Sequence, residues 1–413
     1  MPKATAALVC AAGALRAIAV SLFGILLAIY LANQGLTPAA IGLVVGCGIA
    51  GSAVATVVAG MWADRWGRRR TQIVVGVLSA TGYVGVAHIT SVVALIGVAF
   101  VGLVNGMGRD RGPASALDQA MLPSLTTDEQ RTWALAWYNA AVDGGHAVGA
   151  LAAALPTFAV KLFAIDSGAA HAATFTMCGM TLLLASLPYA LLPAAVETPA
   201  SGADGRGAAI GPETRSVVKR IALLFGMDSV GAGFLNASLV AYWFFERYGT
   251  SEAQLAGLFF AARTLNVVSH VAAAWIARRV GLLNTMVFTH LPSSVLLMLA
   301  PAASTGAVAA ALFLAREALV EMDVPTRQSY VMAVVPPAAR TYASGMTNVA
   351  RNTGWAVGPL VAGTVMQHVA LAGPLFIGGT LKIAYDILLY RSFRHVRPPE
   401  EARPVRVTVG VVE

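Results

Sequence analysis

The sequence predicts an all-α membrane protein whose twelve transmembrane helices form two pseudo-symmetric bundles of six. Three observations lead to this prediction: the composition, a series of long apolar segments, and one sequence pattern that recurs in both halves. Hydrophobic residues make up 57% of the 413 residues and charged residues 12%, whereas a soluble domain carries about 25% charged residues. This composition disfavours a soluble fold.

The remaining totals exclude several other classes. A net charge of +8 would suit a nucleic-acid partner only on a soluble basic module with interleaved aromatics, and the chain has none. Cys10, Cys47 and Cys178 lie in apolar runs and offer neither a disulfide framework nor metal-ligand spacing. We therefore expect no nucleic acid, no metal and no cofactor. The apolar run after Lys3 is too long for a signal peptide and predicts a retained first helix.

Twelve apolar segments are long enough to cross a bilayer, which takes about 20 residues. In chain order they are 11–31, 39–62, 71–89, 92–121, 131–155, 172–192, 217–245, 252–277, 282–300, 305–335, 341–368 and 371–390. Residues 196–216 interrupt the series with Pro, Gly, Ser and mixed charge, which predicts a linker. The bundles are then 1–195 and 217–393, and a polar tail covers 394–413.

Orientation follows from the connections between the segments. Their basic residues fall on one side of the threading, and only Lys161 and Arg247 fall on the other. By the positive-inside rule, both termini and the linker are cytoplasmic. The composition, rich in Ala, Gly and Arg, favours a bacterial inner membrane.

The loop after the second segment carries the most specific motif. Residues 60–70 read Gly-Met-Trp-Ala-Asp-Arg-Trp-Gly-Arg-Arg-Arg. Gly60 and Gly67 permit close helix approach and a tight turn, whereas Arg65 and Arg68 favour the cytoplasmic face. The loop resembles the loop 2-3 signature of the major facilitator superfamily, G-x-x-x-D-R-x-G-R-[RK]-[RK]. The resemblance implies a secondary transporter, not an enzyme, that works by alternating access.

The resemblance also implies a role for Asp64. In the family this carboxylate lies near the start of the eleventh helix, here around Thr341, where free N–H groups and the helix dipole favour an anion. It would hold the two halves together on the cytoplasmic side.

A gapless internal repeat supports the two-bundle prediction. Residues 131–151 align with 340–360, and the coinciding pairs are Arg131/Arg340, Thr132/Thr341, Asn139/Asn348, Gly145/Gly354 and Gly149/Gly358. Parallel repeats of this kind place the substrate site near mid-depth between the halves.

Charges inside spanning segments are costly, so each is a candidate functional residue. The tenth segment carries Arg316, Glu317, Glu321, Asp323 and Arg327. Glu317 and Glu321 share a helix face, and two such carboxylates in low dielectric cannot easily both ionise. They are our first proton-coupling candidates. The alternative is a structural network in which Asp323 and Arg327 lock the cytoplasmic end.

The fourth segment carries Arg109 and Arg111 just before a Gly-Pro step. Aligning its proline with the proline of the tenth segment sets Arg109 against Glu321 and Arg111 against Asp323. The resemblance implies that helices 1, 4, 7 and 10 line a central cavity. We therefore predict a charge-paired inner gate that closes in the outward-open state.

The other intramembrane polar residues complete the candidate set. Arg351 binds an anion or neutralises a carboxylate, and Lys382 and Asp386, four residues apart, form a local pair. The substrate-binding or gating candidates are Arg16, Arg109, Arg111, Asp228, Asn236, Arg316 and Arg351.

A second polar group lies in the fifth and eighth segments. The resemblance implies that these helices touch, so an ion pair between Asp143 and Arg263 is expected. His146 titrates near neutrality and is a candidate for a proton relay, with a packing role as the alternative.

One motif departs from the drug-proton antiporters of the superfamily. Their G-x-x-x-G-P-x-x-G-G motif stops here after Gly145-His-Ala-Val-Gly149, and Val101 replaces their helix 4 arginine. The sequence therefore predicts a proton-coupled carrier of a small organic solute. The arginines among the candidates favour an anionic solute. Drug efflux by proton antiport is the alternative function. From a different functional class, the chain could be a transporter-like membrane sensor. The expected partners are the bilayer, a small-molecule substrate and protons, and the chain is expected to be a monomer.

Overall fold

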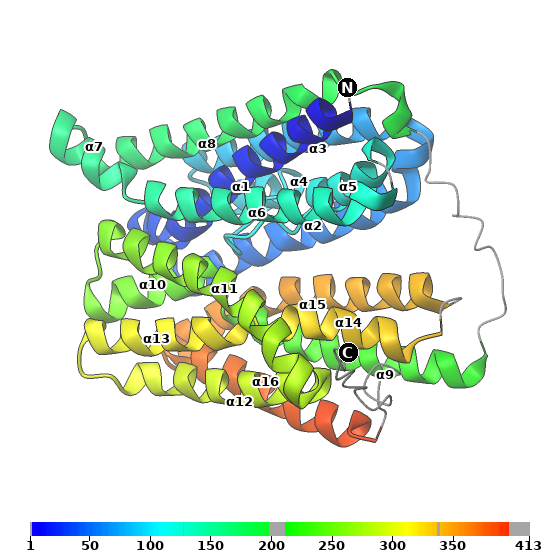
Figure 1. The fold of residues 1–413 in the computed structure, drawn as a ribbon. Coiled ribbons are helices and arrows are strands. Elements are labelled where there is room, and N and C mark those ends of the chain that lie inside the picture. The colour runs from blue at the N-terminus through cyan, green and yellow to red at the C-terminus, as the bar shows by residue number, and fades with distance from the viewer. Residues whose placement is uncertain (1, 127, 198–210, 337–338, 396–413) are drawn as a thin grey trace, which may run out of the picture.

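The computed structural model describes residues 2–126, 128–197, 211–336 and 339–395. The described part is helical and contains no strand, which confirms the all-α prediction. Helices before the linker form one bundle and helices after it form a second, lying side by side (Figure 1).

The first bundle contains α1 to α8. Thr37 caps α2 by accepting a hydrogen bond from the Ala40 N–H, and Gly67 turns the chain into α3 with a φ of 100°. The tight turn expected at this glycine is therefore present. The helices are α1 (Pro2–Asn33), α2 (Pro38–Trp66), α3 (Arg68–His88), α4 (Val92–Val101), α5 (Pro113–Met121), α6 (Asp128–Ala152), α7 (Leu155–Phe163) and α8 (Ser167–Ala190).

The second bundle contains α9 to α16. Ser251 and Gln254 form a capping box at the start of α11, which satisfies two backbone donors of its first turn. The helices are α9 (Pro212–Phe234), α10 (Ala237–Tyr248), α11 (Glu252–Val280), α12 (Leu282–Leu299), α13 (Gly306–Val320), α14 (Asp323–Val334), α15 (Arg340–His368) and α16 (Gly373–Phe393).

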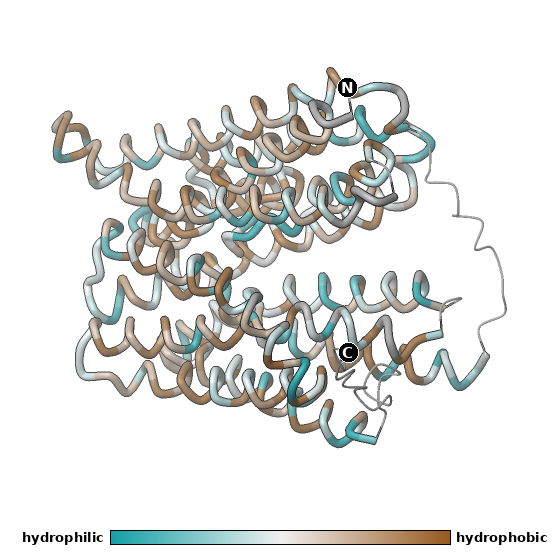
Figure 2. Tube along the Cα trace, viewed as in Figure 1, coloured by the Kyte–Doolittle hydropathy of each residue, from teal (hydrophilic) through white to brown (hydrophobic). Residues whose placement is uncertain are grey.

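Apolar side chains cover most of both bundles (Figure 2). Seven helices of the described chain are long and apolar enough to cross a membrane. Large apolar side chains remain exposed on them, as Met180 and Leu184 do on α8. A surface of this kind suits contact with lipid tails.

Three predicted continuous segments are broken. Segment 92–121 becomes α4 and α5, separated by the non-helical residues 102–112, and segments 217–245 and 305–335 break near Asn236 and Glu321. Residues 102–112 include Gly102, which packs against Gly82 so closely that a Cβ would meet backbone at 2.2 Å. Asn236 ends one break by capping α10. Broken helices are tolerated at membrane depth where they line a cavity.

The two bundles meet at one end of the molecule. There α2 packs on α15, α1 on α10, and α6 on α11. Gly42 and Gly363 allow the closest approach, since a Cβ on Gly42 would lie 2.5 Å from the Pro359 carbonyl oxygen. The opposite end, where α8 ends and α9 begins, is called the linker end below. Towards the linker end the bundles diverge (Figure 1).

Candidate functional site

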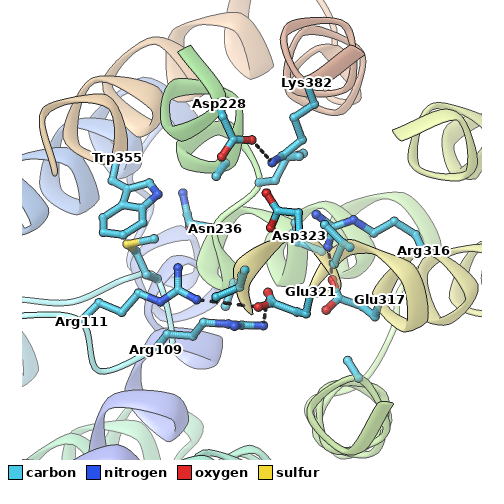
Figure 3. Close-up of a pocket in the computed structure, with 18 of the residues that line it drawn as sticks. Arg109, Arg111, Asp228, Asn236, Arg316, Glu317, Glu321, Asp323, Trp355 and Lys382 are labelled. Atoms are coloured by element: carbon cyan, nitrogen blue, oxygen red, sulfur yellow. Dashed lines mark hydrogen bonds and ion pairs between the residues drawn. The ribbon is translucent and has the colours of Figure 1, made fainter. Parts of the chain in front are cut away.

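A cavity lies between the bundles at mid-depth. It has two chambers, with volumes of about 110 and about 420 Å³. The smaller chamber is lined mainly from the second bundle (Figure 3), and the larger one from α5, α6 and α11. Residues that line both chambers are Arg109, Arg111, Arg263, Glu321 and Val324.

Arg109 and Glu321 form an ion pair between the bundles, where the chambers join. The Nη2 atom of Arg109 lies 2.8 Å from Oε1 of Glu321. The non-helical residues 102–112, called the irregular segment below, position this arginine. The Asn105 side chain donates to the Arg109 carbonyl oxygen and accepts from the Met107 N–H. The opposition of Arg109 and Glu321 expected from the sequence is thus present.

One detail of the predicted gate is wrong. Arg111 lies 3.9 Å from the second oxygen of Glu321 and does not pair with Asp323, which holds Arg327 at 3.0 Å instead. The sequence also predicts a gate that closes in the outward-open state. In the described structure the Arg109–Glu321 pair is formed while the bundles diverge at the linker end (Figure 1), and the state in which the gate closes stays a prediction.

Glu317 and Glu321 do not share one electrostatic environment. Glu317 pairs with its neighbour Arg316, whereas Glu321 pairs with Arg109 across the bundles. Each carboxylate therefore has its own guanidinium partner (Figure 3), which offsets the mutual repulsion on which the proton-coupling prediction was based.

Asp228 is the centre of a buried network in the second bundle. It accepts from Lys382 Nζ at 2.7 Å and from Arg327 Nη1 at 3.1 Å. His290 links Lys382, at 3.4 Å, to Asp386, at 3.0 Å. The predicted local pair of Lys382 with Asp386 is therefore wrong, because the lysine reaches across to α9.

Arg16 is the centre of a corresponding network in the first bundle. Its guanidinium donates to Asp110 at 2.7 Å, to Asp118 at 2.6 Å, and to the hydroxyl groups of Tyr138 and Tyr189. It is buried and lines neither chamber. The Arg16 guanidinium is thus occupied by structural contacts inside the first bundle. The prediction that Arg16 lines the substrate cavity is wrong.

The predicted pair of Asp143 with Arg263 is also absent. Both residues line the larger chamber, but Asp143 lies 3.9 Å from His146, and Arg263 donates to the Gly108 carbonyl oxygen at 3.1 Å. The Nε2 atom of His146 accepts from the Asp110 N–H at 2.8 Å. Arg263, the partner expected for Asp143, is therefore bound by the carbonyl oxygen of Gly108.

Three arginines of the cavity lack a close carboxylate among the described residues. Arg263 has a carbonyl partner alone, and Arg111 keeps the long contact with Glu321. Arg351 lies over the Trp355 ring at 4.7 Å, and Arg111 over the same ring at 5.4 Å. The buried Nε atoms of Arg263 and Arg351 have no hydrogen-bond partner in the part of the chain that the structure describes. These guanidinium groups are available to an anion.

Other cavity residues escaped the sequence analysis. Asn266 and His270 line the larger chamber beside Arg263. These three positions fall on one face of α11, and that spacing of polar residues in an apolar segment was the available signal. Trp355 and His290 line the smaller chamber, and nothing in their local sequence distinguished them. Lys382 lines it too, although the sequence analysis gave this lysine only a local partner.

The basic loop is only partly as predicted. Asp64 is half exposed and pairs with Arg68 at 2.7 Å, and a Cβ on Gly60 would contact nothing within 4 Å. No close helix approach therefore occurs at Gly60 in this state. The side chain of Thr341, the expected neighbour of Asp64, lies outside the described residues.

Comparison with known proteins decides the family. Residues 9–359 match the family model described as Major Facilitator Superfamily. The chain belongs to the major facilitator superfamily. Members of this superfamily are membrane transporters, so the solute pathway of such a protein is the cavity between its two halves.

Known proteins similar to this major facilitator chain include one curated relative and many solved structures. An uncharacterized membrane protein of Saccharomyces cerevisiae is 23% identical over 410 residues, which cover 92% of each chain. The nucleoside transporter NupG is 14% identical with a TM-score of 0.69, covering 94% of this chain and 98% of its own. The inward-open xylose transporter XylE from E. coli is 16% identical with a TM-score of 0.70, covering 95% and 96%. At these identities the solved structures establish the fold alone.

Proposed function

We propose that this protein is a secondary transporter that carries a small organic anion by alternating access. The observation that supports the substrate class is the set of three cavity arginines without a close carboxylate: Arg111, Arg263 and Arg351. Guanidinium groups recognise carboxylates and phosphates through paired hydrogen bonds. Trp355, which lies beside two of them, offers an apolar face to the rest of such a solute.

Orientation is part of the proposal. The basic residues of the connections support a cytoplasmic position for the linker and both termini, and the composition supports a bacterial inner membrane. The linker end is the open one, so the described state is then inward-open. The bundles 1–195 and 217–393 rock about the cavity as two bodies, joined by 196–216 and followed by the tail 394–413, and the protein works as a monomer.

Coupling to protons is proposed at the larger chamber. Of the four candidates Glu317, Glu321, Asp143 and His146, the first two carry arginine partners. Within the described part of the chain, the ion-pair partner of Asp143 is the distant His146 alone, and the Asp143 side chain is 43% exposed and lines the larger chamber. A carboxylate in that position exchanges protons with the open side more readily than one held by a guanidinium.

Thermal stabilisation of the purified protein tests the substrate class. A solute that binds only the folded state at 100 times its Kd stabilises it by about 2.7 kcal/mol. We expect organic carboxylates or phosphates to raise the melting temperature, and sugars and lipophilic cations to leave it unchanged. Arg351→Gln should abolish the shift, whereas Arg247→Gln, at an exposed arginine outside the cavity, should retain it.

Flux into proteoliposomes separates transport from sensing. A ligand that stabilises the protein and is also accumulated supports a carrier, and a ligand that binds without flux supports the transporter-like sensor. Stabilisation by a lipophilic cation that depends on Glu317 or Asp228 would overturn the anion proposal in favour of drug efflux.

A further inference from the structure

A buried histidine pairs with a glutamate across the two bundles at the closed end. His171 lies near the start of α8 and is 2% exposed. Its Nδ1 atom is 2.7 Å from the Ser167 carbonyl oxygen, and its Nε2 atom is 2.6 Å from Oε1 of Glu252. Both ring nitrogens therefore face an oxygen acceptor.

This arrangement requires an additional proton. A neutral imidazole has one N–H group and can donate to only one of two acceptors. The second short contact then needs a proton on the other ring nitrogen or on the Glu252 carboxyl group. Two other buried histidines differ. His146 accepts from a backbone N–H, and His290 lies between the Asp386 carboxylate and the Lys382 ammonium, so each is satisfied as a neutral ring.

The pair joins the bundles at the end away from the linker. Glu252 is the first residue of α11, and its other carboxylate oxygen accepts from the Thr157 hydroxyl of α7 at 2.9 Å. One glutamate of the second bundle is thus held by two residues of the first. Among the described residues, the other hydrogen bonds between the bundles at this end, such as the one from the Ala39 N–H to Gln367, involve no titratable group.

No fixed cation replaces the proton. In the part of the chain that the structure describes, Glu252 forms ion pairs with no Lys or Arg. The Tyr30 ring of α1 stacks on His171 with centroids 5.7 Å apart, and the Asp166 side chain caps α8. The other described His, Lys, Arg and Glu side chains on elements near this end are exposed: His88 on α3, Lys161 on α7, Glu246 and Arg247 on α10, and His368 on α15. Tyr242 of α10 is buried and Tyr248 is half-buried.

We propose that the proton shared by His171 and Glu252 binds when this end closes and is released when it opens. The inference rests on the proposed alternating access, because opening this end must separate α8 from α11. Since the closed state holds one proton more than the open state, raising the pH favours opening. The ratio of open to closed molecules then rises by up to tenfold per pH unit. The acidity of the compartment facing this end therefore controls how readily the cavity opens to it.

Spin-label distances across the closed end test the proposal without any substrate. Labels at Lys161→Cys and Arg247→Cys, both exposed positions, are placed in a protein whose three native cysteines are replaced. In the parent protein the population with separated labels should grow as the pH rises from about 5.5 to 8.5. His171→Gln keeps a donor towards Glu252 but cannot titrate, so its distance distribution should not change with pH. Glu252→Gln should also lose the pH response.

His88→Gln is the matched control, because His88 lies at the same end, is exposed and contacts only Thr176 among the described residues. It should keep the parent response. An unchanged pH response in His171→Gln, or no response in the parent protein, would overturn the proposal. A parent protein whose labels separate with pH but which moves no solute would instead count against the proposed function, so the two failures are distinguishable.

Discussion

Reversing the charge of Arg109 probes the shorter of the two arginine contacts that Glu321 makes across the bundles in the described structure. At 2.8 Å from Glu321, the Coulomb attraction is about 6 kcal/mol at an effective dielectric constant of about 20. Desolvation of both groups offsets much of it, and coupled pairs in such networks measure about 0.5–3 kcal/mol. We therefore expect a coupling of about 1–3 kcal/mol, which corresponds to about 5- to 150-fold in rate.

The assay is solute uptake into proteoliposomes by Arg109→Glu, Glu321→Arg and the double variant. Each single reversal places two like charges together and should abolish uptake, and the double variant should recover part of it. Arg247→Gln is the control, because this exposed arginine lies outside the cavity, and its loss should leave uptake unchanged. A double variant no more active than the weaker single variant would refute the reasoning.

Three further changes have definite expected outcomes. Arg16→Met leaves two buried carboxylates without their cation and should lower the free energy of unfolding in detergent by about 3–5 kcal/mol. Gly42→Leu cannot fit against the Pro359 carbonyl oxygen, so spin-label distances across the closed end should lengthen. Gly97→Leu, where a Cβ meets nothing within 4 Å, should leave them unchanged. Asp64→Asn should favour the inward-open state, seen as longer distances across the linker end, and shorter distances there would contradict this role of the carboxylate.

The helices were predictable because their apolar segments are long and their ends carry clear signals. Thr37 and Ser251 precede α2 and α11 as caps, and Gly67 marks the turn into α3. The breaks in three segments were not predicted, because an apolar window does not register a local change of backbone direction. Four glycines in residues 102–112 were the available warning.

The site was harder to predict than the helices, because spacing along one helix does not specify partners on another. The opposition of Arg109 and Glu321 followed from aligning the two halves. Lys382, however, binds Asp228 on α9 and not Asp386, which lies four residues away on its own helix. Long flexible side chains reach across helices, so a charged pair on one helix face is weak evidence for contact when a deeper carboxylate lies within reach.

The opposite charges at corresponding positions also limit how the halves can be combined. Arg16 and Asp228 are separated by the same number of residues as Arg109 and Glu321, so the alignment that matches Pro113 with Pro325 matches both pairs. In the first pair each charge is neutralised by partners inside its own bundle, so neither bundle needs the other to balance that charge. In the second pair the partners face each other across the pseudo-twofold axis. A chain built from two copies of the first bundle would place arginine against arginine at this position, and two copies of the second would place glutamate against glutamate. Each half therefore needs the other half to neutralise its charge there.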